Sequence, residues 1–190
     1  MTTVLFYNGV LYADSRSQVA NSTQDGSPTT YTDTFDYTTK VHAFDNVMWS
    51  GSGYISDIYD FVARYISEGS DLFLNHRSRK ATRSGTSVVG VFKNNAVVAL
   101  RAVAREGIIN RIRYGNYHWS VEVFLKDYTE ETGKWFALGT GKDYLNQALT
   151  DFHCSPELAM KHAVASDPGS GGTISKHFYN EEGNYVTQSI

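Results

Sequence analysis

The sequence is poor in the residues that form covalent or metal cross-links. Cys154 is the single cysteine among 190 residues, so neither an intrachain disulfide nor a zinc site built from several cysteines is possible. The six histidines show no spacing typical of metal ligands. We therefore expect no cofactor and no metal, and we interpret Cys154 as an inert thiol.

Positive charge and long apolar runs are also scarce. The net charge is -3 and the pI is near 6.0, so the chain lacks the concentrated positive field that nucleic acids and anionic membranes require. A basic stretch with Arg77, Arg79, Lys80 and Arg83 is interpreted as a solvated face or a patch between subunits. No apolar run is long enough to cross a bilayer, and the first residues lack the plan of a secretory signal. We therefore expect a cytoplasmic protein that binds neither nucleic acid nor membrane.

The length fits one domain. With 41% hydrophobic and 19% charged residues, a chain of 190 residues can bury one sizeable core but is short for two. We expect a single domain over residues 1–190.

The first sixteen residues predict a tight hairpin. Two β-prone runs, 4–7 and 10–13, flank Asn8-Gly9, the pair that best tolerates the positive φ angles of a two-residue type I′ turn. With the turn fixed, the numbers of paired residues add up to 17, and Thr3 faces Asp14. The register therefore brings an acidic side chain beside the start of the chain.

The remaining segments predict alternating hairpins and helices. Residues 17–38 are interpreted as a long surface loop or an irregular hairpin, and residues 38–53 as a second hairpin that ends in a Gly-Ser-Gly elbow. Helical spacing follows over residues 55–66, with Ser56 as a candidate N-cap. Within 68–118, we predict that residues 87–103 form two short strands joined at Asn94-Asn95 or are partly helical.

The last third gives clearer signals. Residues 120–141 read as a hairpin with Thr132-Gly133 near its turn, and helices are predicted over 142–152 and 155–166. Ser155 and Pro156 are a good N-cap and first helical residue for the second helix. A final strand is predicted over 173–180. This order suggests helices packed outside stacked antiparallel sheets.

Thr2 is a candidate nucleophile. If Met1 is trimmed, Thr2 carries both a hydroxyl and a free α-amine, whose unperturbed pKa of about 7.7 to 8.0 lets it accept the hydroxyl proton. One residue would then serve as nucleophile and base. The ordinary alternative is a β-branched strand residue without chemistry.

Five segments in order raise the case for chemistry. TTVLFYNGVLYADSR, TTKV, WSGSGYISD, ALGTG and ASDPGSGG resemble the proteasome β-subunit and HslV-like family of N-terminal-nucleophile (Ntn) hydrolases. The resemblance implies an α+β fold, a four-layer αββα sandwich in which two stacked, mostly antiparallel sheets are flanked by helices. It further implies a threonine-type endopeptidase that acts on peptides or unfolded proteins. Such proteins work as homo-oligomeric rings, with an unfoldase ATPase as a candidate partner.

The resemblance assigns roles to seven residues, which are Thr2, Asp14, Lys40, Gly53, Thr140, Asp167 and Ser170. Thr2 matches the nucleophile and Asp14 the acidic residue that orients the site. Lys40 matches the lysine whose ammonium lowers the pKa of the amine and hydroxyl.

The other four matches concern the oxyanion and the amine. Gly53 matches the glycine whose backbone N–H stabilises the oxyanion. Thr140 stands where the family has a serine. Asp167 and Ser170 match a D-x-x-S-G segment that holds the N-terminal amine by hydrogen bonds.

Three departures from the family pattern leave alternatives open. The first hairpin is shorter in both strands, the loop before Lys40 is longer, and a retained Met1 would block the amine. With Met1 retained, the chain would be a catalytically inactive structural or assembly protein that reuses the fold. A further alternative is an Ntn amidase that acts on a small amide.

Overall fold

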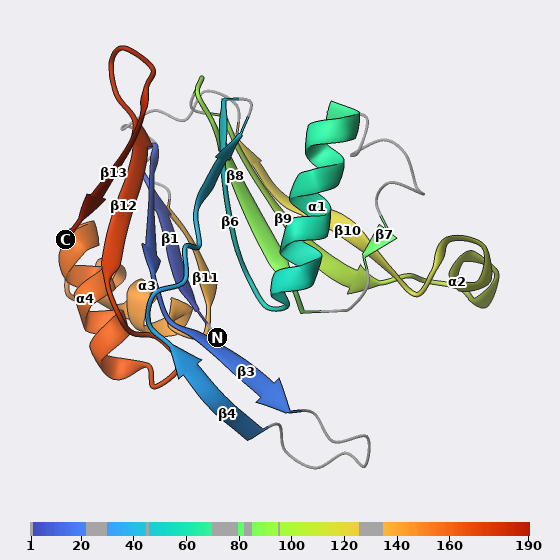
Figure 1. Ribbon diagram of the computed structural model, residues 1–190, viewed down its shortest axis with the longest axis horizontal. Coiled ribbons are helices and arrows are strands. Elements are labelled where there is room, and N and C mark those ends of the chain that lie inside the picture. Colours follow the sequence, from blue (N-terminus) through green and yellow to red (C-terminus); the bar gives the residue numbers. More distant parts are fainter. Residues whose placement is uncertain are drawn as a thin grey trace. The chain divides into compact units, whose positions relative to one another are not determined.

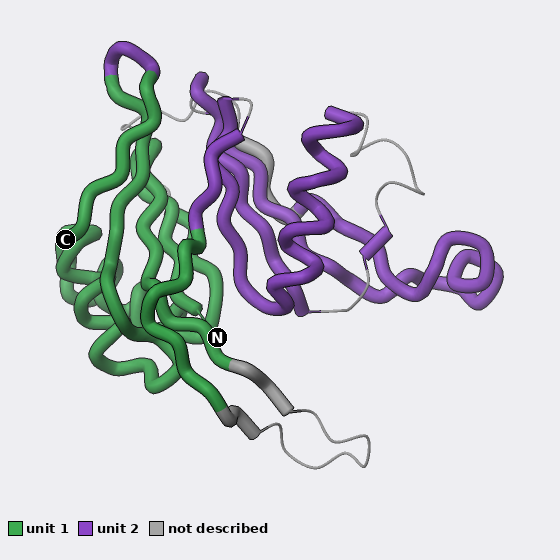
Figure 2. Tube along the Cα trace, in the orientation of Figure 1, with its two compact units in different colours: residues 1–40, 134–180, 184–190 green, residues 41–133, 181–183 purple. Residues whose placement is uncertain are grey.

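The computed structural model describes residues 2–21, 30–44, 46–69, 80–81, 85–94, 96–125 and 135–190. It divides into two compact units, shown in different colours in Figure 2. Unit 1 contains residues 1–40, 134–180 and 184–190, and unit 2 contains residues 41–133 and 181–183. Each unit has a sheet and helices of its own (Figure 1). The single domain over residues 1–190 stays a prediction.

Unit 1 contains a five-stranded antiparallel sheet in the order β11-β1-β2-β12-β13. Its strands are β1 (Thr3–Tyr7), β2 (Val10–Asp14), β11 (Trp135–Gly139), β12 (Ile174–Tyr179) and β13 (Tyr185–Ser189). Helices α3 (Lys142–Thr150) and α4 (Pro156–Ser166) pack together and against β1 (Figure 1). Apolar side chains from the sheet and both helices form the core between them, including Leu5, Leu145 and Met160, which are fully buried.

The N-terminal hairpin has the predicted register. Val4 pairs with Ala13 and Tyr7 with Val10, so paired numbers add up to 17. Asn8 and Gly9 have φ angles of 46° and 74°, as a type I′ turn requires. The prediction that β1 and β2 form a tight hairpin is confirmed.

Two further predictions in unit 1 have clear outcomes. Helix α4 begins as predicted, because the Ser155 hydroxyl accepts the backbone N–H of Leu158 at 3.3 Å and Pro156 is the first helical residue. Residues 17–38 contain a two-stranded sheet of β3 (Ser17–Asn21) and β4 (Thr30–Phe35), whose register shifts once. The irregular hairpin was therefore the correct alternative.

Unit 2 contains a six-stranded antiparallel sheet in the order β5-β6-β8-β9-β10-β7. Its strands are β5 (His42–Phe44), β6 (Val47–Ser52), β7 (Lys80–Ala81), β8 (Ser87–Phe92), β9 (Val97–Ala104) and β10 (Tyr117–Leu125). Helix α1 (Ile55–Glu68) packs against β6, and the short helix α2 (Ile108–Tyr114) joins β9 to β10 (Figure 1). The ring of Phe61 lies at 5.3 Å from Trp49 and 4.9 Å from Trp119 at the centre of this core.

The described part of residues 87–103 contains two strands. Strands β8 and β9 flank Asn94-Asn95, as predicted, and the partly helical alternative for them is wrong. Asn95 itself lies outside the described residues, as do Arg77, Arg79 and Arg83 of the basic stretch.

Two sequence predictions are wrong. Residues 120–141 do not form a hairpin, because β10 pairs with β7 and β9 while β11 pairs with β1; the predicted turn at Thr132-Gly133 lies outside the described residues. Alternation of apolar residues identifies a strand but not its partner. Ser56 is not an N-cap, since α1 begins at Ile55 behind Tyr54, whose side chain makes no cap bond.

The described part of the chain is an α+β structure of antiparallel sheets and four helices. The stacking of four layers stays a prediction. Within the described residues, none of the helices combines the length and the apolar character needed to cross a membrane.

Candidate active site

Six of the seven residues assigned from the sequence lie in unit 1, which contains Thr2, Asp14, Lys40, Thr140, Asp167 and Ser170. The seventh, Gly53, belongs to unit 2 and lies in the turn between β6 and α1, with a φ angle of +106°. Its role in binding an oxyanion stays a prediction.

Asp14 is the centre of the first group of polar contacts. It ends β2 and is fully buried. One of its oxygens, Oδ1, accepts the Thr2 hydroxyl at 3.0 Å, the Thr3 backbone N–H at 2.8 Å and the Lys40 ammonium at 2.6 Å. The other oxygen, Oδ2, accepts the backbone N–H of Gly171 at 2.9 Å. Hydrogen bonds from this many donors hold the carboxylate in one orientation.

Lys40 and Asp14 form a buried ion pair. Its side chain is 7% exposed and that of Asp14 is 0% exposed. Burial lowers the pKa of Lys40, and the charge and hydrogen bond of Asp14 oppose that effect without cancelling it. The site thus contains a cation that gives up its proton more readily than a surface lysine.

Asp167 is the centre of a second group. It follows α4, and its carboxylate accepts the hydroxyls of Ser170 at 2.6 Å and Thr140 at 2.5 Å and the backbone N–H of Gly169 at 3.1 Å. Burial raises the pKa of Asp167, but the hydrogen bonds from Ser170, Thr140 and Gly169 outweigh it and hold that pKa below its ordinary value.

Thr3 joins the two groups. Its backbone N–H donates to Asp14, and its hydroxyl is in hydrogen-bond contact with the Ser170 hydroxyl. The whole residue is inaccessible to solvent. Sequence reasoning gave Thr3 no role; the signal available for it was the predicted register, which placed Thr3 opposite Asp14.

The segment after β11 fixes the backbone of Thr2. The Thr140 N–H donates to the Thr2 carbonyl at 3.0 Å. Gly139 has a φ angle of +92°, and a Cβ built on it would lie 1.7 Å from the Thr2 carbonyl oxygen. Only glycine allows this approach. This glycine of the ALGTG segment is therefore needed for β11 to contact the backbone of Thr2.

Other polar residues in the described part of the chain do not form a metal centre. No group of three or more His, Cys, Asp or Glu residues is arranged to hold a metal ion within the described ranges. His177 is buried and bonds to the hydroxyls of Ser175 at 2.8 Å and Tyr185 at 2.7 Å. Cys154 is a half-buried free thiol that packs against the core of unit 1.

Comparison with known proteins gives matches in structure alone. No family model matches the sequence, and no curated protein matches it. The solved structures that are similar include Anbu from Hyphomicrobium sp. strain MC1. A Gly-1 mutant of Anbu gives a TM-score of 0.58 at 15% identity over 100% of this chain and 88% of that chain. A second Anbu structure gives 0.56 at 14% identity over 100% and 87%. Eukaryotic HslV from Trypanosoma brucei gives 0.49 at 12% identity over 100% and 99%.

The likeness to Anbu, at 14% and 15% identity, concerns the fold and not the activity. It agrees with the five sequence segments that indicated the same group of proteins. The chain therefore shares the proteasome-like fold of the Anbu structures.

Proposed function

We propose that the protein is a threonine-type Ntn hydrolase that cleaves peptide bonds, with Thr2 as the nucleophile once Met1 has been removed. The observation that carries this proposal is the contact of the Thr2 hydroxyl with Asp14, whose same oxygen binds the buried ammonium of Lys40. A hydroxyl at the start of a strand can be satisfied by water or by the backbone, so a buried ion pair beside it is not required by the fold.

The α-amine of Thr2 is the proposed base. As encoded, its nitrogen forms a peptide bond with Met1 and has no basic lone pair. After removal of Met1, an amine with a pKa of about 7.7 to 8.0 can take the hydroxyl proton at neutral pH. The ammonium of Lys40 favours the neutral amine and the ionised hydroxyl through its charge, while Asp14 keeps that ammonium in place.

Asp167, Ser170 and Thr140 are proposed to position the amine. The hydroxyls of Ser170 and Thr140 both donate to Asp167, and the Ser170 oxygen also contacts the Thr3 hydroxyl. Each oxygen keeps at least one lone pair that could accept from an ammonium. Thr140 keeps the hydroxyl of the family's serine and adds a methyl group. These residues would hold the nitrogen of Thr2 while the proton moves to it and back.

The proposed reaction has two steps. The Thr2 oxygen bonds to the carbonyl carbon of the peptide, the C–N bond breaks, and the departing amine takes the proton that the α-amine received. Water then attacks the resulting ester, the C–O bond breaks, and the hydroxyl of Thr2 is restored. We propose Gly53 as a donor to the oxyanion in both steps.

The assembly is proposed from the sequence resemblance. We propose a homo-oligomeric ring in the cytoplasm that acts on peptides or unfolded proteins, with an unfoldase ATPase as a candidate partner. A closed ring would confine the sites of all subunits to an inner chamber.

The first test is the intact mass of the protein purified from its native host. Loss of the mass of Met1 is expected, because only then is the amine free. A mature chain that keeps Met1 would exclude the proposed mechanism and support the inactive structural protein.

The second test is covalent labelling of the assembled, trimmed protein with a peptide epoxyketone, which reacts with a hydroxyl and an adjacent free amine. We expect one label per chain in the wild type, none in Thr2→Ala, and slower labelling in Thr2→Ser. Absence of label in the trimmed wild type would contradict the proposal. Hydrolysis of small amides with no preference for longer peptides would instead identify an amidase.

A further inference from the structure

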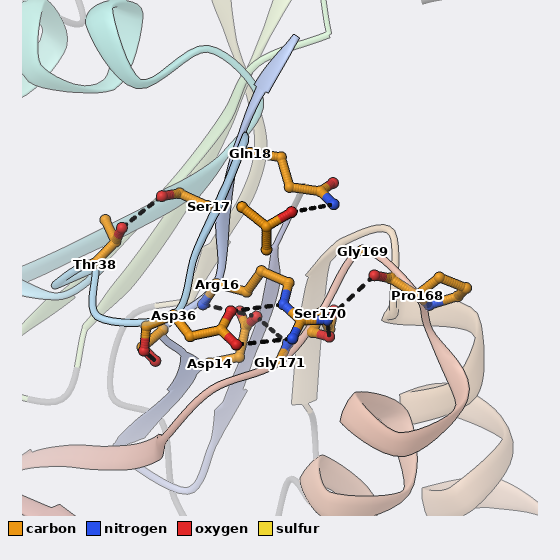
Figure 3. Close-up of polar contacts among 12 residues, drawn as sticks. Asp14, Arg16, Ser17, Gln18, Asp36, Thr38, Pro168, Gly169, Ser170 and Gly171 are labelled. Atoms are coloured by element: carbon orange, nitrogen blue, oxygen red, sulfur yellow. Dashed lines mark hydrogen bonds and ion pairs between the residues drawn. The ribbon is translucent and has the colours of Figure 1, made fainter. Parts of the chain in front are cut away.

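Arg16 makes a set of contacts that the proposed chemistry does not use. Its guanidinium forms two parallel bonds to the carboxylate of Asp36, Nε to Oδ1 at 2.7 Å and Nη2 to Oδ2 at 2.8 Å. The third nitrogen, Nη1, donates to the carbonyl oxygens of Ser170 at 2.9 Å and Pro168 at 3.4 Å. Figure 3 shows these bonds converging on Arg16, next to Asp14 and Gly171.

These contacts join three segments that supply the candidate site. Arg16 follows Asp14 by two residues, and its own backbone N–H lies 3.4 Å from Oδ2 of that carboxylate. Asp36 precedes Lys40 by four residues in a stretch without regular structure. The carbonyl of Ser170 belongs to the loop whose hydroxyl and N–H groups bind Asp167 and Asp14.

The surrounding atoms are arranged to keep the guanidinium in place. A Cβ on Gly171 would lie 2.2 Å from Cζ of Arg16, so the guanidinium lies directly against the backbone of this glycine. Ser15 makes a parallel connection, because its hydroxyl donates to the carbonyl of Asp36 and accepts the N–H of Thr173 at 2.9 Å.

We propose that Arg16 is a positioning residue, which sets the geometry of the candidate site by clamping the segment before Lys40 to the loop of Ser170. This proposal rests on the proposed function. The planar fork of arginine satisfies a carboxylate and two carbonyls at once, a task that the point charge of lysine does not perform. The clamp acts through Lys40 and Ser170 and does not touch the reacting atoms.

The chain offers a matched control for this clamp. Arg64 and Asp60 in α1 form an ion pair with the same side-chain exposures as Arg16 and Asp36, 26% and 46%. Arg64 also donates to a carbonyl, that of Lys80, at 3.0 Å. This pair lies within one helix of unit 2, whereas Arg16 and Asp36 belong to unit 1. Arg64→Ala therefore reports what the loss of such an exposed pair does by itself.

The experiment measures peptide hydrolysis by the trimmed, assembled protein. We expect Arg16→Ala to lower kcat by about 10- to 100-fold, because a misplaced catalytic group costs rate even when binding is intact, with KM changed by less than about threefold. Arg16→Lys should recover little of the rate. Millimolar methylguanidinium should restore part of the kcat of Arg16→Ala and leave the wild type and Arg64→Ala unchanged.

Amide hydrogen exchange separates failure of the clamp from failure of the proposed function. Arg16→Ala should speed exchange in both 36–40 and 167–173, whereas Arg64→Ala should speed exchange in neither. This measurement needs no activity, so it tests the clamp even if the wild type proves inactive. Unchanged exchange in both segments, or wild-type kcat in Arg16→Ala, would overturn the proposal.

Discussion

The ammonium of Lys40 donates at 2.6 Å to the same oxygen of Asp14 that accepts the hydroxyl of Thr2. The pair is shielded from water, since the two side chains are 7% and 0% exposed. Each charge therefore depends on the other for its solvation. This dependence gives the site a role in stability as well as its proposed role in chemistry.

Lys40→Met should destabilise the protein by about 3 to 5 kcal/mol, because it leaves the buried carboxylate of Asp14 without a counter-charge. Asp14→Asn combined with Lys40→Met should cost less than the two single changes added together. Urea unfolding of the wild type, both single variants and the double variant measures this coupling. Additive effects would show that the two charges do not depend on each other.

Acid should remove the contribution of Asp167 to stability. Its pKa in the folded chain lies below its ordinary value, so the unfolded chain binds the proton more readily. The contribution is then complete above the ordinary pKa of about 3.9 and is lost as the pH falls through the lower folded value.

The measurement is the unfolding free energy of the wild type and of Asp167→Asn between neutral and acidic pH. The difference between the two should be constant above about pH 5 and should shrink below the ordinary pKa of an aspartic acid, about 3.9. A difference that stays constant throughout, or that grows in acid, would contradict the assignment.

Much of this site could be predicted from the sequence where local rules apply. The Asn8-Gly9 turn fixed the pairing of β1 with β2 and so placed Thr3 opposite Asp14. The start of α4 followed from Ser155 and Pro156. The distance between Asp167 and Ser170 is local as well, since both belong to one loop after that helix.

The parts that were missed depend on contacts between distant segments. Strand β11 pairs with β1, from which it is separated by more than half of the sequence. The alternation of apolar and polar residues in β11 does not show whether its partner is β1 or the nearer β10. The contact of Thr3 with Ser170 depends on where the loop 167–173, which leads into β12, lies in the folded unit. Arg16 gave no signal, because an arginine in a polar stretch is ordinarily solvated.

The hydroxyl of Thr3 should matter more than its shape. Thr3→Val keeps the volume and the β-branched shape of the side chain. It removes one hydrogen-bond partner of the buried Ser170 hydroxyl, and the loss of such a partner costs about 1 to 3 kcal/mol. Thr3→Ser keeps the hydroxyl. We expect the valine variant to lower both the unfolding free energy and the rate of labelling, and the serine variant to lower each only slightly.

The test compares urea unfolding and epoxyketone labelling across the two variants and the wild type. Thr150→Val provides a control, because the exposed Thr150 hydroxyl in α3 contacts the Asn146 carbonyl and Asp151, outside the group around Thr3. Equal labelling by the valine and serine variants would show that Thr3 does not connect the groups of Asp14 and Asp167.

Gly139→Ala should damage the site far more than an alanine at another glycine with positive φ. The φ angle of Gly139 is +92°, and the added Cβ would meet the Thr2 carbonyl oxygen at 1.7 Å. Gly69, at the end of α1, has a φ angle of +60° and no atom within 4 Å of such a Cβ, so it shares the unfavourable backbone without the collision. Gly69→Ala should therefore cost only the backbone strain, about 1 to 3 kcal/mol. Gly139→Ala adds overpacking, typically a further ~1 to 3 kcal/mol, and must displace Thr2 from Asp14.

Thermal unfolding measures the loss of stability in the two glycine variants, and labelling of Thr2 measures its displacement. Similar losses of stability in the two variants, with Thr2 still labelled in Gly139→Ala, would mean that the close approach of β11 to Thr2 does not hold the nucleophile in place.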